Sequence, residues 1–251
     1  MTARPAIHSL IFCDIDGCLS FGKNVPMDLP RLAAMRALLP ELAKAGIGFT
    51  LSTGRPQPYA EAMAQVLGVD LPFVCEGGAM VYVPETDAYL AMAGDEGMAA
   101  IHALRRAIEN SGIIGDQVFF EIGKAYSLCL TGPAISGRGH AVIRGIMEDF
   151  KARYADYPVV WTHSTTSVDI TPMGTNKGSG LRAVCDMLGV DQANSIAIGD
   201  SNNDMSMLTI AGRACCPANA SDEVKAVAQT VANQDYADGV LAILRDILAS
   251  A

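Results

Sequence analysis

The chain lacks any apolar run long enough to cross a membrane. Its 251 residues include no stretch that approaches the ~20 apolar residues a bilayer requires. The apolar run at residues 10–13 passes directly into aspartates, with no signal-peptide pattern around it. We therefore expect a cytoplasmic protein without a membrane partner.

Basic runs and paired cysteines are missing as well. The formal net charge is −9, and no cluster of Lys or Arg occurs. We expect no nucleic-acid partner, because binding to a phosphate backbone relies on cationic side chains. The cysteines are odd in number and show no Cys-x-x-Cys spacing, which supports neither a disulfide framework nor a zinc site. Neither Gly-x-Ser-x-Gly nor a P-loop motif is present, which disfavours a serine hydrolase and a nucleotide-dependent enzyme.

What the sequence does contain is an alternation of strand and helix signals at both ends. Short apolar runs at 10–13, 47–51 and 73–75 are separated by segments with helical spacing. The same rhythm resumes after Pro172, with another apolar run at 195–198. Such alternation is typical of βαβ units, so the sequence predicts an α/β fold with a doubly wound, Rossmann-like parallel sheet.

The middle of the chain follows a different pattern, in which helices accompany antiparallel strands. We expect residues 1–84 and 172–251 to form a catalytic core, and residues 85–171 to form an inserted α+β cap subdomain. The elements expected in the cap are helices over 96–110 and 139–154, a hairpin over 118–122 and 126–130, and strands over 159–162 and 167–170.

Two carboxylates stand one residue apart directly after the first apolar run, in Asp14-Ile15-Asp16-Gly17. Ligands of open α/β sheets bind beyond the carboxyl ends of the strands, and residues at this spacing project to the same side of an extended backbone. One carboxylate could attack an electrophile while the other handles a proton, or both could face a cation. A solvated turn that ends the strand is the alternative.

Three further polar groups follow predicted strands or begin predicted helices. Thr53 and Gly54 offer a hydroxyl and a flexible backbone amide, which suit phosphate oxygens. Lys177 opposes the dipole of the helix it begins, which favours a nearby anion. Residues 199–204 bring Asp200 and Asp204 together with amide side chains. A solvated lysine and ordinary helix capping are the alternatives. Taken together, the four groups fit Mg²⁺-assisted phosphoryl transfer through an aspartyl-phosphate.

With these motifs in this order, the chain resembles phosphatases of the haloacid dehalogenase superfamily. The position of the insertion resembles type IIB members, the Cof-like and sucrose-phosphatase-like branch, whose cap is an α+β subdomain. Within that branch, residues 199–204 and 216–220 are similar to archaeal-type phosphoglycolate phosphatases. One departure is Gly77, in Glu76-Gly77-Gly78, where relatives often carry Asn.

The resemblance assigns roles to the residues of the motifs. Asp14 would be the nucleophile, and Asp16 would protonate the leaving alkoxide and then activate water. Thr53 and Lys177 would hold the phosphoryl oxygens, beside the backbone of Gly54. The implied substrate is a small phosphate ester.

The resemblance also implies Mg²⁺ as the cofactor. Asp14, the backbone carbonyl of Asp16 and Asp200 would bind the ion. Asp204, together with Asn203, would complete the metal shell or its surroundings.

Residues of the cap are expected to select the substrate. Arg138 precedes an expected helix in a Gly-rich turn, which could bind an anion. His140, Trp161 and His163 are further candidates for substrate contacts, and Arg55 could contact the substrate or stabilise its own turn. A surface position, or a core position for Trp161, is the alternative for each cap residue.

The sequence therefore predicts a Mg²⁺-dependent phosphomonoesterase that acts on phosphoglycolate or a sugar phosphate. A phosphomutase or phosphotransferase with the same core chemistry is one alternative. A non-catalytic protein that binds phosphorylated metabolites is another, but Asp14 and Asp16 argue against it, because a binding site for an anion has no need of two carboxylates. The oligomeric state is left open.

Overall fold

The computed structural model describes residues 6–251. Its centre is a five-stranded sheet in the order β12-β11-β10-β1-β2, with every neighbouring pair parallel. The side chains of β1 and β10 are buried on both faces, apart from Ser9 at the start of β1. The predicted parallel-sheet α/β fold is thus confirmed. The strands are β1 Ser9–Cys13, β2 Ile47–Leu51, β10 Ser195–Ile198, β11 Arg213–Cys216 and β12 Thr230–Val231.

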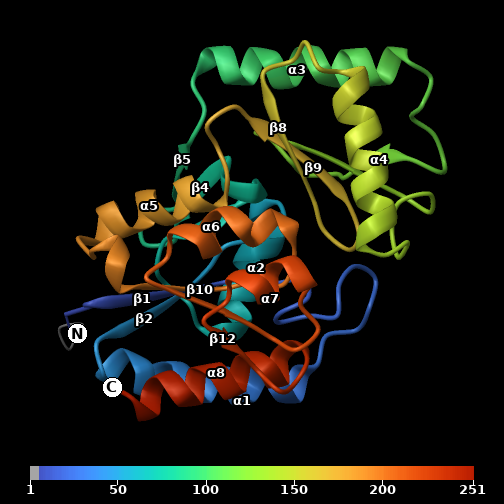
Figure 1. Ribbon diagram of the computed structural model, residues 1–251. Helices are drawn as coiled ribbons and strands as arrows, with labels where there is room; N and C mark the ends of the chain where they lie inside the picture. Colours follow the sequence, from blue (N-terminus) through green and yellow to red (C-terminus); the bar gives the residue numbers. More distant parts are fainter. Residues whose placement is uncertain (1–5) are drawn as a thin grey trace.

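Helices cover both faces of this sheet (Figure 1). Helices α1, α2 and α8 pack on one face, where Ile11 and Leu51 belong to their apolar cluster. Helices α5, α6 and α7 pack on the other face with Leu10 and Phe12. Neighbouring residues of one strand therefore serve opposite cores, as the alternation of a strand requires. The bounds are α1 Leu29–Lys44, α2 Gln57–Leu67, α5 Lys177–Leu188, α6 Met205–Ile210, α7 Asp222–Val227 and α8 Tyr236–Ala249.

A second, antiparallel sheet of three strands continues from the edge of the parallel sheet. A single bridge between Ser52 and Val74 joins the two. Its strands are β3 Phe73–Cys75, β4 Met80–Val83 and β5 Ala88–Ala91, in that order. Because β5 pairs with β4, the predicted boundary after residue 84 falls between two paired strands. The division into core and cap stays a prediction, and residues 1–5 of the predicted core lie outside the described chain.

The middle of the chain forms a separate antiparallel sheet in the order β6-β7-β9-β8, with α3 and α4 packed against it (Figure 1, upper part). This arrangement confirms the α+β character predicted for the insertion, which we call the cap. Its own apolar cluster includes Leu104, Ile143 and Ile170. Its elements are α3 Asp95–Asn110, β6 Phe119–Phe120, β7 Leu128–Thr131, α4 His140–Arg153, β8 Val159–His163 and β9 Val168–Pro172.

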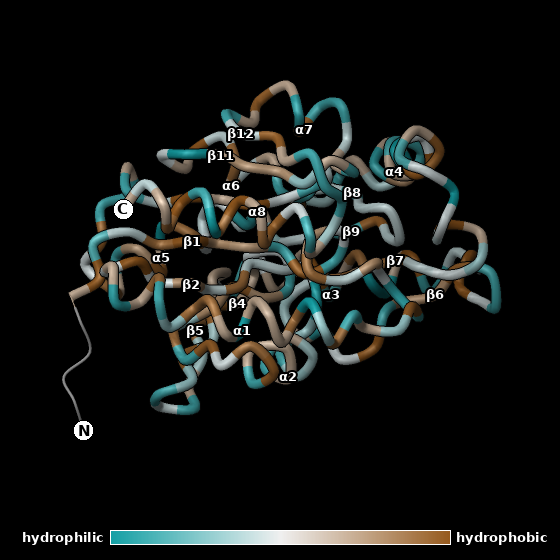
Figure 2. The backbone as a smooth tube through the Cα atoms, turned by 90° about the horizontal axis from the view of Figure 1, so that it is seen from below, coloured by the Kyte–Doolittle hydropathy of each residue, from teal (hydrophilic) through white to brown (hydrophobic). Residues whose placement is uncertain are grey.

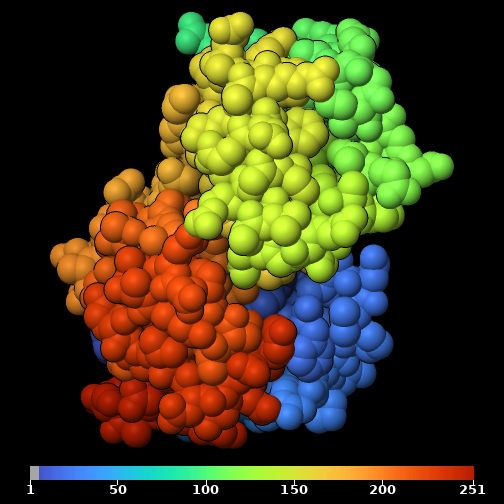
Figure 3. Space-filling model, turned by 45° about the vertical axis from the view of Figure 1, so that its right-hand side comes forward, coloured from blue at the N-terminus to red at the C-terminus, as the bar shows by residue number. Residues whose placement is uncertain are grey.

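The cap lies over the carboxyl ends of the central strands. The amide of Asp14 donates to the carbonyl of Ile198 at 2.9 Å, and the amide of Ser52 donates to the carbonyl of Cys13 at 2.9 Å. The ends of β1, β2 and β10 are therefore level. Figure 3 shows the green and yellow cap resting on the blue and red core. In Figure 2, the apolar colour follows β1 through the interior.

The described part of the chain also contains three short 3₁₀ turns, two of which lie beside these strand ends. They are η1 Glu76–Gly78, η2 Gln192–Asn194 and η3 Asn202–Asp204. Within residues 6–251, none of the helices combines the length and the apolar composition that crossing a membrane requires.

Candidate active site

Asp14 and Lys177 form a buried ion pair at the centre of the site. Asp14 directly follows β1 and is 3% exposed, and Lys177 is 1% exposed. The ammonium of Lys177 lies 2.9 Å from Oδ1 of Asp14. The alternative of a solvated surface lysine at this position is therefore wrong.

Lys177 is held between two carboxylates. Besides Asp14, its Nζ donates to Oδ1 of Asp204 at 2.6 Å. Asn176 caps the helix that Lys177 begins, through a reciprocal pair of hydrogen bonds with Ser179. Burial by itself would lower the pKa of the Lys177 ammonium, but the two carboxylates raise it above its ordinary value. These anions offset the unfavourable helix dipole at this position.

Asp204 fixes the loop that carries Asp200. Oδ2 of Asp204 accepts hydrogen bonds from the backbone amides of Asp200 and Ser201, both at 3.0 Å. The loop begins at Gly199, where an added Cβ would lie 2.5 Å from the Asp204 side chain. Helix capping is therefore part of what Asp204 does. Its other oxygen binds Lys177, so it orders both the loop and the lysine.

Three carboxylates converge at a position that suits a hard cation. Asp14, Asp200 and Asp204 each offer an oxygen within 4.8 Å of the others. Oδ1 of Asp200 is buried and has no hydrogen-bond partner among residues 6–251. Gly17 makes room for this side chain, because an added Cβ would lie 2.1 Å from Oδ2 of Asp200. An all-oxygen donor set with an unpartnered buried carboxylate oxygen fits Mg²⁺.

Electrostatics point to the same conclusion. Burial, followed by the neighbouring carboxylates, raises the pKa of Asp14 to about 7 in spite of Lys177. Burial and the same neighbours raise the pKa of Asp200 above its ordinary value. Crowded acids of this kind lose their protons more readily when a cation binds between them.

The side chain of Asp16 points to a different partner. Arg55 donates to it with both Nε, at 2.6 Å, and Nη2, at 2.8 Å. The guanidinium of Arg55 also lies 4.5 Å from the centre of the Tyr59 ring. This two-pronged contact fixes the planar orientation of the Asp16 carboxylate. The geometry thus separates the two carboxylates of the first motif, since Asp14 meets Lys177 and Asp16 meets Arg55.

The residues after β2 complete the core side. Thr53 is fully buried, and its Oγ1 accepts a hydrogen bond from the amide of Arg55 at 3.1 Å. Its own amide donates to the carbonyl of Val74 at 3.0 Å, which fixes the turn. Gly54 lines the same cavity as Asp14.

A cavity runs between core and cap, and its two walls come from distant parts of the chain. The core wall consists of Asp14, Asp16, Gly54, Arg55 and Asn203. Lys23 reaches the cavity from the loop after β1, and the cap wall consists of Glu121, Ser164, Thr166, Ser167 and Asp169. The structure thereby brings together five of the candidate residues, Asp14, Asp16, Gly54, Arg55 and Asn203.

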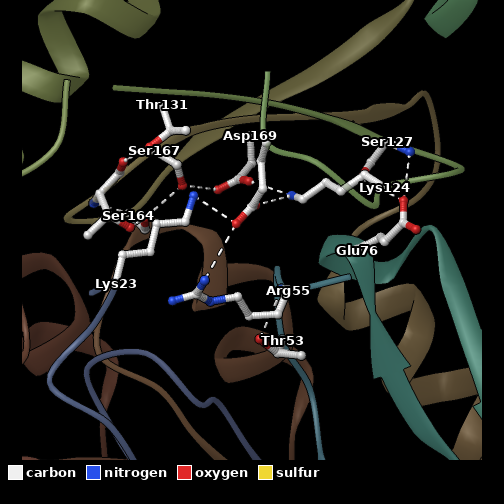
Figure 4. Close-up of polar contacts among 12 residues, drawn as sticks. Lys23, Thr53, Arg55, Glu76, Lys124, Ser127, Thr131, Ser164, Ser167 and Asp169 are labelled. Atoms are coloured by element: carbon white, nitrogen blue, oxygen red, sulfur yellow. Dashed lines mark hydrogen bonds and ion pairs between the residues drawn. The ribbon is translucent and has the colours of Figure 1, made fainter. Parts of the chain in front are cut away.

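The polar network of the cap wall was missed by sequence reasoning (Figure 4). Glu121 lies 2.7 Å from the ammonium of Lys23 and 3.6 Å from that of Lys124. Lys124 lies 3.0 Å from Asp169, which also accepts from Ser167 at 2.9 Å. One signal was available, because Asp169 is a charged residue inside the otherwise uncharged segment that forms β9.

Glu76 joins the core to the cap. Its carboxylate is buried and accepts from the amides of Ala125, Tyr126 and Ser127 at 2.8–2.9 Å, and from Oγ of Ser127 at 3.0 Å. Glu76 adopts a positive φ of 51° to make these contacts, and Gly77 follows with a φ of 67°. Consecutive left-handed residues suit the glycine found at position 77.

The cap residues proposed from sequence lie elsewhere. Arg138 is exposed, and Trp161 stacks on Phe150 with ring centres 6.4 Å apart. His163 is buried, with its ring centre 6.0 Å from that of His140. Burial lowers the pKa of both imidazoles. None of these four side chains lines the cavity that contains Asp14, so the geometry gives a substrate contact by them no support.

Comparison with known sequences finds related hydrolases. A family model for haloacid dehalogenase-like hydrolases matches residues 11–117 and 138–244. A phosphoglycolate phosphatase of Methanopyrus kandleri is 29% identical over 251 residues, which cover 96% of this chain and 97% of that protein. A phosphoglycolate phosphatase of Halorubrum lacusprofundi is 32% identical over 198 residues, which cover 78% of this chain and 82% of that protein.

Solved structures share the fold. A HAD/COF-like hydrolase from Plasmodium vivax aligns with a TM-score of 0.75 at 17% identity and covers 98% of both chains. The sucrose-phosphatase of Synechocystis, solved with sucrose and phosphate, aligns with a TM-score of 0.68 at 17% identity. That alignment covers 96% of this chain and 98% of the sucrose-phosphatase.

Proposed function

Since this chain belongs to the family of haloacid dehalogenase-like hydrolases, we propose that it is a Mg²⁺-dependent phosphomonoesterase for a small phosphorylated metabolite. One observation carries this proposal: buried Asp14 is paired with Lys177, and close to it Asp200 offers a buried oxygen that has no hydrogen-bond partner among residues 6–251. The phosphoglycolate phosphatases among its relatives support a small phosphate ester as substrate.

In the proposed reaction, Asp14 acts twice. Its carboxylate attacks phosphorus, a new O–P bond forms, and the bond from phosphorus to the leaving oxygen breaks. Asp16 gives its proton to that oxygen. In the second step Asp16 takes a proton from water, and the water oxygen attacks phosphorus. The bond between phosphorus and the Asp14 oxygen breaks, which releases inorganic phosphate and restores the Asp14 carboxylate.

The other core residues bind and orient. Lys177 would keep the attacking carboxylate in place, and Thr53 and Gly54, in the turn after β2, would donate to the phosphoryl oxygens. Mg²⁺, held by Asp14, Asp200 and the carbonyl of Asp16, would supply the positive charge that allows a carboxylate to approach a phosphate ester. Asp204 would support this site through Lys177 and the Asp200 amide.

The test is release of inorganic phosphate from a panel of small phosphate esters. The wild type is assayed with Mg²⁺ and with EDTA, beside Asp14→Asn and a matched control, Asp116→Asn, which changes an exposed aspartate. We expect release that requires Mg²⁺, survives in the control and disappears in Asp14→Asn. Release by Asp14→Asn at the wild-type rate would contradict the proposal, as would a folded wild type that hydrolyses no ester. Transfer to an added sugar in preference to water would instead favour a phosphotransferase.

A further inference from the structure

The cap wall presents carboxylates to the cavity, while one of its cations lies behind them. Glu121 and Asp169 line the cavity, but Lys124 does not. The side chain of Lys124 is 3% exposed, and it contacts both carboxylates from within the cap. The cation that does line the cavity from the loop after β1, Lys23, is paired with Glu121 at 2.7 Å.

Asp169 is a charged acceptor at this position. Burial works against its ionisation, but Lys124 and the hydroxyl of Ser167 more than offset this, so the pKa of Asp169 is lowered. Its hydroxyl neighbours form a chain: Ser167 donates to Asp169 at 2.9 Å, and Ser164 lies 2.9 Å from Ser167. Hydroxyl groups thus lie next to the Asp169 carboxylate on the cap wall (Figure 4).

Contacts with the core hold the segment around Lys124 in place. The four hydrogen bonds to Glu76 hold residues 125–127, directly after Lys124. Gly123, on the other side of Lys124, lies against the core, since an added Cβ would be 3.6 Å from Pro56. Polar groups held in this way select a ligand by matching its donors and acceptors, because little reorganisation is needed.

The net charge on the cap side of the cavity decides which chemical group of a substrate can bind there. Glu121 and Asp169 balance Lys23 and Lys124, so the cap side of the cavity offers no net positive charge. Lys23 and Arg55 line the cavity, but Glu121 already pairs with Lys23 and Asp16 with Arg55. A carboxylate in the substrate would therefore find both cations occupied, and it would meet Glu121 and Asp169 as like charges. An apolar group would remove water from the two carboxylates without replacing it. A hydroxyl donates to a carboxylate and accepts from an ammonium.

Resting on the phosphatase function proposed above, we propose that the leaving group of the substrate is an uncharged fragment with hydroxyl groups, bound by Glu121 and Asp169. The substrate class is then a polyol or sugar phosphate, in preference to a phosphorylated carboxylic acid such as phosphoglycolate.

Three esters of matched size test this proposal. In 2-hydroxyethyl phosphate, phosphoglycolate and ethyl phosphate, a two-carbon group ends in a hydroxyl, a carboxylate and a methyl group, respectively. We expect kcat/KM for 2-hydroxyethyl phosphate to exceed both others about tenfold, because one hydrogen bond to a charged group is worth about that factor. Glycerol phosphate should be better still.

Two variants tie the preference to the named residues. Asp169→Asn and Glu121→Gln each remove one negative charge and keep the shape, and Asp149→Asn, an exposed change on the cap, is the control. We expect each of the first two to raise the ratio of phosphoglycolate to 2-hydroxyethyl phosphate activity about tenfold, and the control to leave it unchanged. Using both residues keeps the test valid if one variant fails to fold, and the wild-type ranking needs neither.

The outcomes separate the two proposals. If the folded wild type hydrolyses none of the esters with Mg²⁺, the phosphatase function itself fails. If it hydrolyses them but prefers phosphoglycolate or ethyl phosphate, the function stands and the inference about the leaving group is overturned. The correct ranking with an unchanged ratio in every folded variant would overturn the assignment to Glu121 and Asp169.

Discussion

On each side of the cavity a lysine lies between two carboxylates, but we assign the two clusters different roles. On the core side Lys177 contacts Asp14 and Asp204, and on the cap side Lys124 contacts Asp169 and Glu121. What differs is the neighbourhood. The core pair lies beside a third carboxylate, Asp200, whose Oδ1 has no hydrogen-bond partner among residues 6–251. On the cap side the hydroxyl of Ser167 donates to Asp169, and Ser164 lies next to Ser167. A buried ion pair does not by itself identify chemistry, and the groups around it decide between catalysis and recognition.

The largest effect on activity is expected from replacing the core lysine, Lys177. We expect Lys177→Met to lower kcat about 10³-fold, which is the scale for losing one electrostatic contact to the reacting groups. It would also leave Asp14 and Asp204 buried without their cation, at a cost of about 3–5 kcal/mol in the free energy of unfolding. Steady-state kinetics and urea unfolding measure the two effects. A variant with normal kcat would show that this lysine does not serve catalysis.

Asp14 on the core side and Asp169 on the cap side are expected to change the stability with pH in opposite directions. The pKa of Asp14 is raised to about 7 in the fold, so the folded state binds more protons than the unfolded state between about pH 4 and 7. The contribution of Asp14 to stability is therefore present at low pH and falls as the pH rises through that window. The pKa of Asp169 is lowered, so its contribution is present above the unfolded pKa and is lost as the pH falls through the folded one.

Thermal unfolding in EDTA and in Mg²⁺ checks this contrast. We expect the stabilisation by Mg²⁺ to be larger at pH 8 than at pH 5.5, because the ion requires the ionised carboxylates. In Asp200→Asn it should be much reduced at both pH values. Equal stabilisation by Mg²⁺ in Asp200→Asn and the wild type would show that the ion binds elsewhere.

Replacing Glu76, which connects the core to the cap, is expected to have a smaller effect on activity and stability. Glu76→Ala removes the acceptor of four cap hydrogen bonds and leaves buried amides unpaired, which should cost about 2 kcal/mol in the free energy of unfolding. KM should rise more than kcat falls, because the variant displaces Lys124 and not Asp14. Glu76→Gln retains one carbonyl oxygen and should restore part of both losses. If Glu76→Gln behaves like Glu76→Ala in KM while both fold normally, the carboxylate does not position the cap wall.

The smallest expected effect comes from the cap lysine. We expect Lys124→Met to lower kcat/KM for a hydroxylated ester about tenfold, mainly through KM, because the residue supports recognition and not the attack on phosphorus. Separate determination of KM and kcat tests this. A loss as large as that of Lys177→Met, and located in kcat, would remove the distinction between the two walls.

The candidate residues on the core side were predictable from the sequence because they belong to short motifs. Asp14, Thr53 and Asp200 each follow an apolar run, and the level ends of parallel strands must bring them together. Lys177 was recognisable because a lysine at a helix start calls for an anion. What the motifs could not provide was the division of labour, such as the pairing of Asp16 with Arg55, which depends on side-chain geometry.

The cap wall resisted prediction because no single stretch of sequence contains it. Glu121 and Lys124 come from a hairpin connection and Asp169 from β9, and only the packing of β7 on β9 makes them neighbours. Trp161 and His163 were candidates for substrate contacts, but in the fold Trp161 stacks on Phe150 and His163 is buried. The contact of Glu76 with the cap was also not predictable, since its partners include backbone amides, which carry no sequence signal.

The most direct test of the central claim is to look for the phosphoryl group on Asp14. A phosphate ester with a labelled phosphoryl group is mixed with Asp16→Asn in Mg²⁺, quenched in acid, digested and analysed by mass spectrometry. Asp16→Asn is used because it slows the hydrolysis of the covalent intermediate, and the ester carries a phenolate leaving group, which departs without a proton from Asp16. We predict one phosphoryl group on the peptide that contains Asp14, and none in the variant that also carries Asp14→Asn. Turnover of the ester without any labelled peptide, or a label on another residue, would contradict the account.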